Sequence, residues 1–75
     1  MLVFLRTKDV LAKTGISRQM LYRYITAGLI EEEQVTPTGR RLFSPDVIKK
    51  IQLIRRVNDS GYPLREIKEI FFRRS

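Results

Sequence analysis

Hydrophobic and polar positions from Ser17 to Leu29 repeat with the period of a helix that has two distinct sides. At about 100° per residue, one side collects apolar and aromatic side chains: Met20, Leu21, Tyr24, Ile25 and Ala27. The opposite side collects polar side chains without a carboxylate: Arg18, Gln19, Tyr22, Arg23 and Thr26. Ser17 is suited to the N-cap, and Gly28 to the position after the C-cap. The pattern therefore predicts an amphipathic helix over residues 18–27 with a basic outer face.

A shorter helix is predicted just before it, over residues 7–14. Thr7 fits its N-cap, Asp9 lies in the first turn, where the helix dipole favours a negative charge, and Gly15 interrupts the pattern. Two short helices joined by a glycine-containing turn, the second of them basic, are typical of a helix-turn-helix. Arginine, glutamine, tyrosine and threonine are side chains that hydrogen-bond base edges and phosphates. An amphipathic helix with a merely solvated polar face is the alternative interpretation.

Two short β-capable segments follow, separated by a turn. Val35 and Leu42-Phe43 flank the string Thr36-Pro37-Thr38-Gly39, which is rich in turn residues. We expect a hairpin in which Gly39 adopts the unusual backbone dihedrals. Another short strand is possible over Val3 to Leu5.

Two further helices complete the pattern. Ser44-Pro45-Asp46 supplies a cap, a proline at the first helical position and an acid in the first turn. The helix that begins there has these apolar residues on one side: Val47, Ile48, Ile51, Ile54 and Val57. A polar break over residues 58–62 precedes Pro63, which begins the last helix. Its inward side chains are expected to be Leu64, Ile67, Ile70 and Phe71.

These elements form one domain over residues 1–75, mainly α with a small β-hairpin. The arrangement is a winged helix-turn-helix, with four helices and the hairpin as the wing. A chain of 75 residues buries only about 60% of its unfolded surface, so its stability should be modest. Phe71 and Phe72 lean towards different faces and cannot both be buried in so small a core. We expect this end to be where a continuation or a partner docks.

Charge and composition narrow the range of partners. Fifteen Lys and Arg against eight Asp and Glu give a net charge of +7, which indicates nucleic acid or an anionic membrane surface. The start, MLVFLRTKD, has too short an apolar run for a signal peptide or a membrane span. The absence of His and Cys excludes zinc fingers, disulfides and His- or Cys-based catalysis. We expect double-stranded DNA as the partner, no membrane, no metal or other cofactor, and a cytoplasmic location.

Three strings, in order, resemble the N-terminal DNA-binding domain of MerR-family transcription regulators: TGISRQMLYRYITAGLI, GRRLFSPDV and GYPLREI. They are similar to that family's helix-turn-helix, to its wing with the start of the next helix, and to its second loop-helix element. The resemblance runs from about Val3 to Phe71. It implies a winged-helix fold, binding to duplex promoter DNA, and a long dimerisation helix followed by a variable effector-sensing region.

The chain departs from the family pattern at three places. Tyr22-Arg23-Tyr24 stands where the family has arginine followed by two aromatic residues, so base contacts cannot be copied over individually. Gly39-Arg40-Arg41 stands where the family has glycine, tyrosine and arginine. The chain ends at Ser75, before the family's dimerisation helix would begin. We expect either an excised domain or a small protein resembling phage excisionases. We therefore expect this chain to be a monomer that dimerises only with a further helix or a partner.

The candidate DNA-binding residues fall in three groups. Arg18, Gln19, Tyr22 and Arg23 are expected to contact bases and phosphates, with Thr26 at the far end of the same face. Arg40 and Arg41 are expected to contact phosphates from the wing. Arg55, with Asn58, lies where the family's second loop touches the DNA backbone. Tyr24 is expected in the core, and residues 31–33, three glutamates, on a solvated surface turned away from DNA.

The predicted function is sequence-specific binding of duplex DNA in transcription regulation, with helix 18–27 in the major groove and the wing at 35–43 on phosphates. One alternative is an excisionase-like architectural factor that bends DNA or assembles with a recombinase. Another, of a different class, is a protein-binding adaptor, for which a continuous basic helix face is not expected. An enzyme is not expected, because the residues lack a catalytic constellation.

Overall fold

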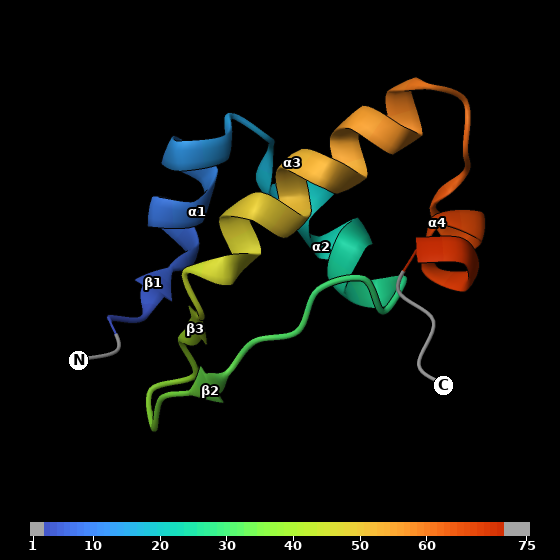
Figure 1. Cartoon of the computed structure of the whole chain (residues 1–75). Helices are drawn as coiled ribbons and strands as arrows, with labels where there is room; N and C mark the ends of the chain where they lie inside the picture. The colour runs from blue at the N-terminus through green and yellow to red at the C-terminus, as the bar shows by residue number, and fades with distance from the viewer. Residues whose placement is uncertain (1–2, 72–75) are drawn as a thin grey trace.

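The computed structural model describes residues 3–71, in which four helices pack together and a small antiparallel sheet lies at one edge of them (Figure 1). In chain order the elements are β1 (Leu5–Arg6), α1 (Thr7–Thr14), α2 (Arg18–Thr26), β2 (Gln34–Val35), β3 (Arg41–Phe43), α3 (Asp46–Asp59) and α4 (Leu64–Phe71). The prediction of a mainly helical domain with a small hairpin is confirmed. No helix in this part of the chain is long and apolar enough to cross a membrane.

Helix α3 runs through the middle of the molecule, with α1 packed near one end and α4 near the other (Figure 1). Its residues Val47, Ile51 and Ile54 are buried as predicted, and Ile48 and Val57 are half-buried against them. The rest of the buried core comes from every other helix, from the turn between α1 and α2, from β3 and from the segment after α2: Val10, Ile16, Leu21, Tyr24, Leu29, Ile30, Phe43 and Ile67. One small core thus fixes α1, α2 and the hairpin relative to α3.

Helix α4 buries less of its predicted apolar side than expected. Ile67 is fully buried, but Ile70 is 57% exposed, so the prediction that it faces inward is wrong. Ile67 fills the contact with the core, and none of the described elements covers the last turn of α4. The predicted docking end at Phe71 and Phe72 falls on side chains outside the part of the chain that the structure describes.

The ends of the two helices of the helix-turn-helix follow from local chemistry. Ser17 caps α2 as predicted, because its Oγ accepts a hydrogen bond from the Met20 amide at 3.1 Å. The cap of α1 lies one residue earlier than predicted. Its residue is Arg6, whose backbone N–H donates to Asp9 Oδ2 at 3.1 Å. Gly15 ends α1 at φ +76°, a conformation that side chains with a Cβ adopt reluctantly.

The later helix boundaries also differ slightly from the prediction. Helix α3 begins at Asp46, whose amide donates to Ser44 Oγ at 3.3 Å. It continues through Asn58 and Asp59, so the polar break before α4 is shorter than the predicted 58–62.

The three strands form an antiparallel sheet in the order β1-β3-β2. Leu5 pairs with Phe43, and Gln34 pairs with Leu42. The predicted hairpin joins β2 to β3, and Gly39 in its turn has φ +85°, as the sequence predicts. The first strand is Leu5–Arg6 rather than Val3–Leu5, because pairing with β3 selects its position. This pairing ties β1 to the wing beside α2.

Candidate nucleic-acid interface

Helix α2 presents the predicted polar face to solvent. We call this surface the recognition face, and its residues, all exposed, are Arg18, Gln19, Tyr22, Arg23 and Thr26. On the other side of the same helix, Leu21 and Tyr24 are buried. The helix is therefore fixed by its apolar side, and the polar side is open to a partner.

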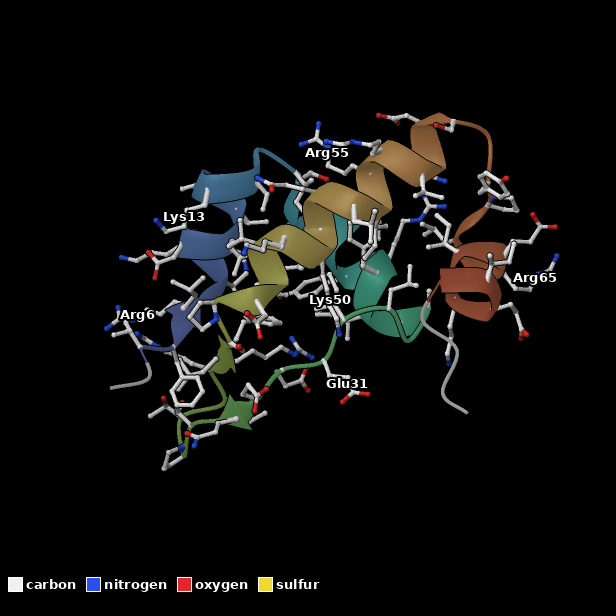
Figure 2. The ribbon with its side chains drawn as sticks, in the orientation of Figure 1. Arg6, Lys13, Glu31, Lys50, Arg55 and Arg65 are labelled. Atoms are coloured by element: carbon white, nitrogen blue, oxygen red, sulfur yellow. The ribbon has the colours of Figure 1, made fainter. Side chains whose placement is uncertain are left out.

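The turn before α2 is held by contacts that the sequence did not reveal. Thr14, only 8% exposed, donates its hydroxyl to the Val10 carbonyl at 2.7 Å and accepts from the Ile16 amide at 3.4 Å. Arg55, which extends from α3 (Figure 2), donates from Nη1 to the Thr14 carbonyl at 2.6 Å. Arg55 was expected near DNA. The structure gives it a contact within the fold, and its contact with DNA stays a prediction.

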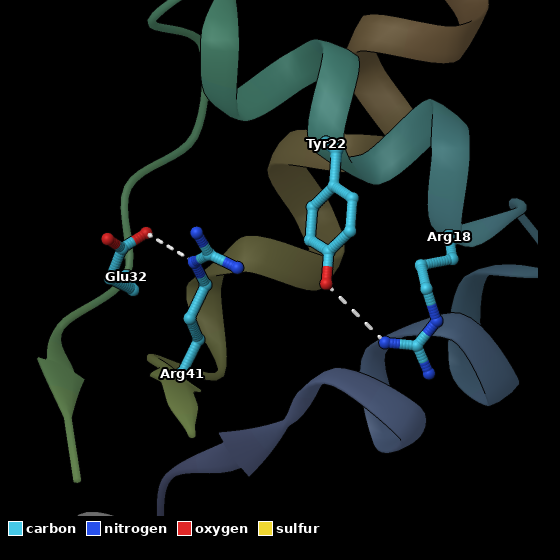
Figure 3. A network of polar contacts seen from close by, with 4 residues as sticks. All are labelled: Arg18, Tyr22, Glu32 and Arg41. Carbon is cyan, nitrogen blue, oxygen red and sulfur yellow. Dashed lines mark hydrogen bonds and ion pairs between the residues drawn. The ribbon is translucent and has the colours of Figure 1, made fainter. Parts of the chain in front are cut away.

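The wing and α2 meet through a chain of four polar side chains (Figure 3). The Arg41 guanidinium lies over the Tyr22 ring, with Cζ 5.2 Å from the ring centroid, a cation–π arrangement. Tyr22 accepts a long hydrogen bond at its hydroxyl from Arg18 Nη1, at 3.5 Å. On its other side, Arg41 Nε is 3.7 Å from Glu32 Oε2. Two predicted DNA-binding groups, the recognition face and the wing, are thus in direct contact.

Glu32 corrects the expectation that the three glutamates turn away from the candidate interface. Its carboxylate reaches Arg41 in the wing, while Glu31 and Glu33 are exposed and line a different depression, together with Lys50 and Lys68. Figure 2 shows the Glu31 side chain pointing outward from the segment between α2 and β2. Glu32 is thus separated from its two neighbours by the cation that its carboxylate reaches.

A basic cleft lies between the start of α1, α2 and the wing. It has a volume of about 460 Å³, and its lining residues are Arg6, Thr7, Lys8, Arg18, Tyr22, Gly39, Arg40 and Arg41. Five of these are cations and none is acidic. Arg6 and Lys8 were not predicted as DNA-binding residues from the sequence, and the pairing of β1 with β3 brings them beside the wing arginines. Their only signal in the sequence was the overall positive charge.

A shallower depression borders the other part of the recognition face. It is largely apolar, and Leu64 at the start of α4 lines it together with Gln19, Tyr22, Arg23, Thr26 and Ala27. The sequence placed Leu64 on the inward side of the last helix, and it is in fact half-buried. The start of α4 therefore adjoins the polar face of α2.

Tyr24 belongs to the core, as predicted, at 2% exposure. Burial raises the pKa of its hydroxyl above the ordinary value. The positive charge of Arg55 lowers this pKa, the negative charge of Asp59 raises it, and the positive charge of Arg23 lowers it. At neutral pH Tyr24 is thus a protonated core residue.

The chain matches the family model described as MerR HTH family regulatory protein over residues 5–73. It is 28% identical over 65 residues to the mercuric resistance operon regulatory protein of Bacillus cereus, covering 87% of this chain and 49% of that protein. An uncharacterised HTH-type transcriptional regulator of Synechocystis is 30% identical over 70 residues, covering 93% of this chain and 51% of that one. The chain thus spans about half the length of these relatives.

The fold is also similar to that of a solved structure. A crystal structure of a MerR-family transcriptional regulator from Bacillus cereus superposes with a TM-score of 0.80 at 22% sequence identity, covering 97% of this chain and 55% of the other. The helix-turn-helix, the wing and the α3–α4 pair all lie within the residues matched by the family model. The chain belongs to the MerR family of helix-turn-helix regulatory proteins.

Proposed function

We propose that this chain binds duplex DNA sequence-specifically, with α2 in the major groove and the wing on the phosphates. The observation that carries the proposal is the continuity of the cationic surface. Arg18 and Tyr22 belong both to the recognition face and to the basic cleft. A helix of this kind fits the width of the major groove, while neighbouring cations bind the DNA backbone.

The side chains divide between base recognition and backbone contact. Arg18 and Arg23 suit bidentate bonding to guanine, and Gln19 suits adenine. Tyr22 and Thr26 suit a phosphate or a thymine methyl group.

The backbone contacts come from the cleft and from α3. Arg40 and Arg41 would bind phosphates from the wing, with Arg6 and Lys8 adding charge beside them. Arg55 would add a backbone contact from α3 through the N–H groups that its bond to the Thr14 carbonyl does not use.

Transcription regulation is the biological setting that we propose for this binding. The Synechocystis relative is named as a transcriptional regulator and the Bacillus cereus relative as an operon regulatory protein, and this chain covers about half of each. An excisionase-like architectural role uses the same surface and remains the second candidate. A protein-binding adaptor is less well supported, because the exposed face of α2 carries two arginines and no carboxylate.

A salt titration of binding to a duplex tests the proposal. With roughly four to six phosphate contacts, the logarithm of the binding constant should fall against the logarithm of salt concentration with a slope of about −4 to −5. Affinity that is unchanged from low to physiological salt would refute nucleic-acid binding.

Substitutions should separate base recognition from backbone contact. Gln19→Ala or Arg23→Ala should cost about 1–3 kcal/mol on the preferred site and reduce discrimination among sites. Arg40→Ala should weaken binding to all duplexes about equally and make the salt slope shallower by about one. Lys13→Ala is the matched control, since Lys13 is exposed on the outer side of α1 (Figure 2). If Arg23→Ala leaves discrimination unchanged, the recognition face is misplaced.

A further inference from the structure

We propose that Glu32 is a positioning residue that competes with DNA phosphate for Arg41 and so limits the affinity of the chain for duplex DNA. The proposal rests on the DNA-binding function above. Arg41 in the free protein lies between the Glu32 carboxylate and the Tyr22 ring (Figure 3). A phosphate that binds Arg41 at its Nε therefore has to displace the Glu32 carboxylate.

The geometry of the pair makes displacement feasible. The separation of 3.7 Å between Nε and Oε2 exceeds the 2.7–2.9 Å of a charge-assisted hydrogen bond, and the two side chains are 42% and 30% exposed. Exposed pairs of this kind are weak and sensitive to salt. Glu32 thus attenuates the charge of Arg41 without removing it from solvent.

The guanidinium edge turned to Glu32 is one that phosphate would use. Arginine binds phosphate most strongly through two parallel N–H groups, and one such pair includes Nε. Arg41 directs Nε at Glu32. Contact with Tyr22 limits the movement of the guanidinium, so the carboxylate and a phosphate compete for the same part of it.

Glu32 is distinguished from the adjacent glutamates by its direction. Glu31 and Glu33 line a separate depression with Lys50 and Lys68, whereas the lining of the basic cleft contains no acidic residue. Glu32 is the residue of the three that reaches a cation of this cleft. Its effect on DNA binding should therefore exceed that of a neighbour with the same charge.

The segment that carries Glu32 does not depend on the ion pair for its position. The Glu33 amide donates to the Leu42 carbonyl at 2.8 Å, and Leu29 and Ile30 are buried just before it. Glu32→Gln should therefore keep the fold, which a thermal unfolding curve verifies before binding is measured.

The experiment compares Glu32→Gln with Glu31→Gln, using the 75-residue chain and two duplexes of equal length and different sequence. Both substitutions change the net charge from +7 to +8. Glu31 is exposed, and within the described residues its side chain makes no ion pair. We expect Glu32→Gln to tighten binding to both duplexes about two- to fivefold at 0.1 M salt, roughly the range of an exposed ion pair. We also expect the salt slope of Glu32→Gln to become steeper by up to about 0.9, the contribution of one phosphate contact. Glu31→Gln should have less than half the effect of Glu32→Gln on affinity.

Repeating both substitutions in an Arg41→Gln background isolates the pair. There, Glu32→Gln should have no larger effect than Glu31→Gln. Equal effects in the native background, or weaker binding by Glu32→Gln, would overturn the proposal, and the latter would mean that Glu32 prepares Arg41 for DNA. If the native chain binds neither duplex in a salt-dependent way, the DNA-binding function itself fails, which is a distinguishable result.

Discussion

Replacing Arg55 by glutamine should destabilise the domain through the helix-turn-helix, although Arg55 lies 41 residues away from Thr14 in the sequence. Arg55 Nη1 donates to the Thr14 carbonyl at 2.6 Å. That carbonyl belongs to the last residue of α1, where carbonyl groups lack partners within the helix and the helix dipole favours a positive charge. Glutamine at this position removes the charge and shortens the reach.

The expected magnitude follows from the type of bond. A hydrogen bond from a charged group contributes about 1.5–3 kcal/mol when well buried, and a cation at a helix C-terminus contributes about 0.3–1 kcal/mol. Arg55 is an exposed residue and its bond to Thr14 is only partly buried, so solvent screens both contributions. We therefore expect a loss of about 1–2 kcal/mol in the free energy of unfolding. For a domain of this size that corresponds to a decrease of roughly 5–12 °C in Tm.

Thermal and urea unfolding followed by far-UV circular dichroism measure this loss, and Arg56→Gln is the matched control. Arg56 is an exposed arginine on the same helix, and its side chain makes no hydrogen bond or ion pair within residues 3–71. If Arg55→Gln loses no more stability than Arg56→Gln, the bond to Thr14 does not stabilise the fold. A large loss of DNA affinity without loss of stability would instead support Arg55 as a backbone contact.

Three other outcomes are expected. Because burial raises the pKa of Tyr24 above its unfolded value of about 10, its contribution to stability is complete below pH 10 and is lost as the pH rises towards the folded pKa. The free energy of unfolding, measured with urea, should fall more steeply with pH across this range for the native chain than for Tyr24→Phe. Parallel pH dependences of the two proteins would contradict the assignment. Gly28→Ala should cost about 1–2 kcal/mol in the free energy of unfolding, because Gly28 has φ +78°. An added Cβ would lie 2.6 Å from Lys68 Nζ, but that atom ends a flexible, exposed side chain that can move away. Gly39→Ala, at φ +85° with open space around it, should therefore cost about as much in urea unfolding. Sedimentation should show the 75-residue chain as a monomer without DNA, since a charge of +7 opposes self-association, and a stable dimer at low micromolar concentration would refute this.

The sequence predicted best the features that depend on neighbouring residues. The two faces of α2 follow from helical periodicity, and Leu21 and Tyr24 are buried opposite the exposed recognition face. Ser17 and Gly39 were predicted from the local chemistry of caps and turns, and both have the expected role. Such features need no knowledge of what packs against them.

The features that escaped prediction depend on segments far apart in the chain. The contact of Arg55 with Thr14 and the placement of Arg6 beside the wing arise only when α3 packs on α1 and β1 pairs with β3. Glu32 looked like part of a solvated run because periodicity cannot tell which of three consecutive glutamates faces the wing. The prediction that Ile70 faces inward was wrong for the same reason, because its exposure depends on how far the neighbouring elements extend.

The contact between Arg41 and Tyr22 changes how mutations at the candidate interface combine. From the sequence alone, Arg41 is a backbone contact whose loss should weaken all duplexes equally. In the structure, Arg41 also rests on the ring of Tyr22, a residue of the recognition face, and Tyr22 in turn accepts a bond from Arg18. Residues in one network do not contribute additively. Arg41→Ala should therefore alter base discrimination as well as overall affinity. The Arg40 guanidinium makes no hydrogen bond, ion pair or cation–π contact within residues 3–71, so Arg40→Ala should report on phosphate binding alone.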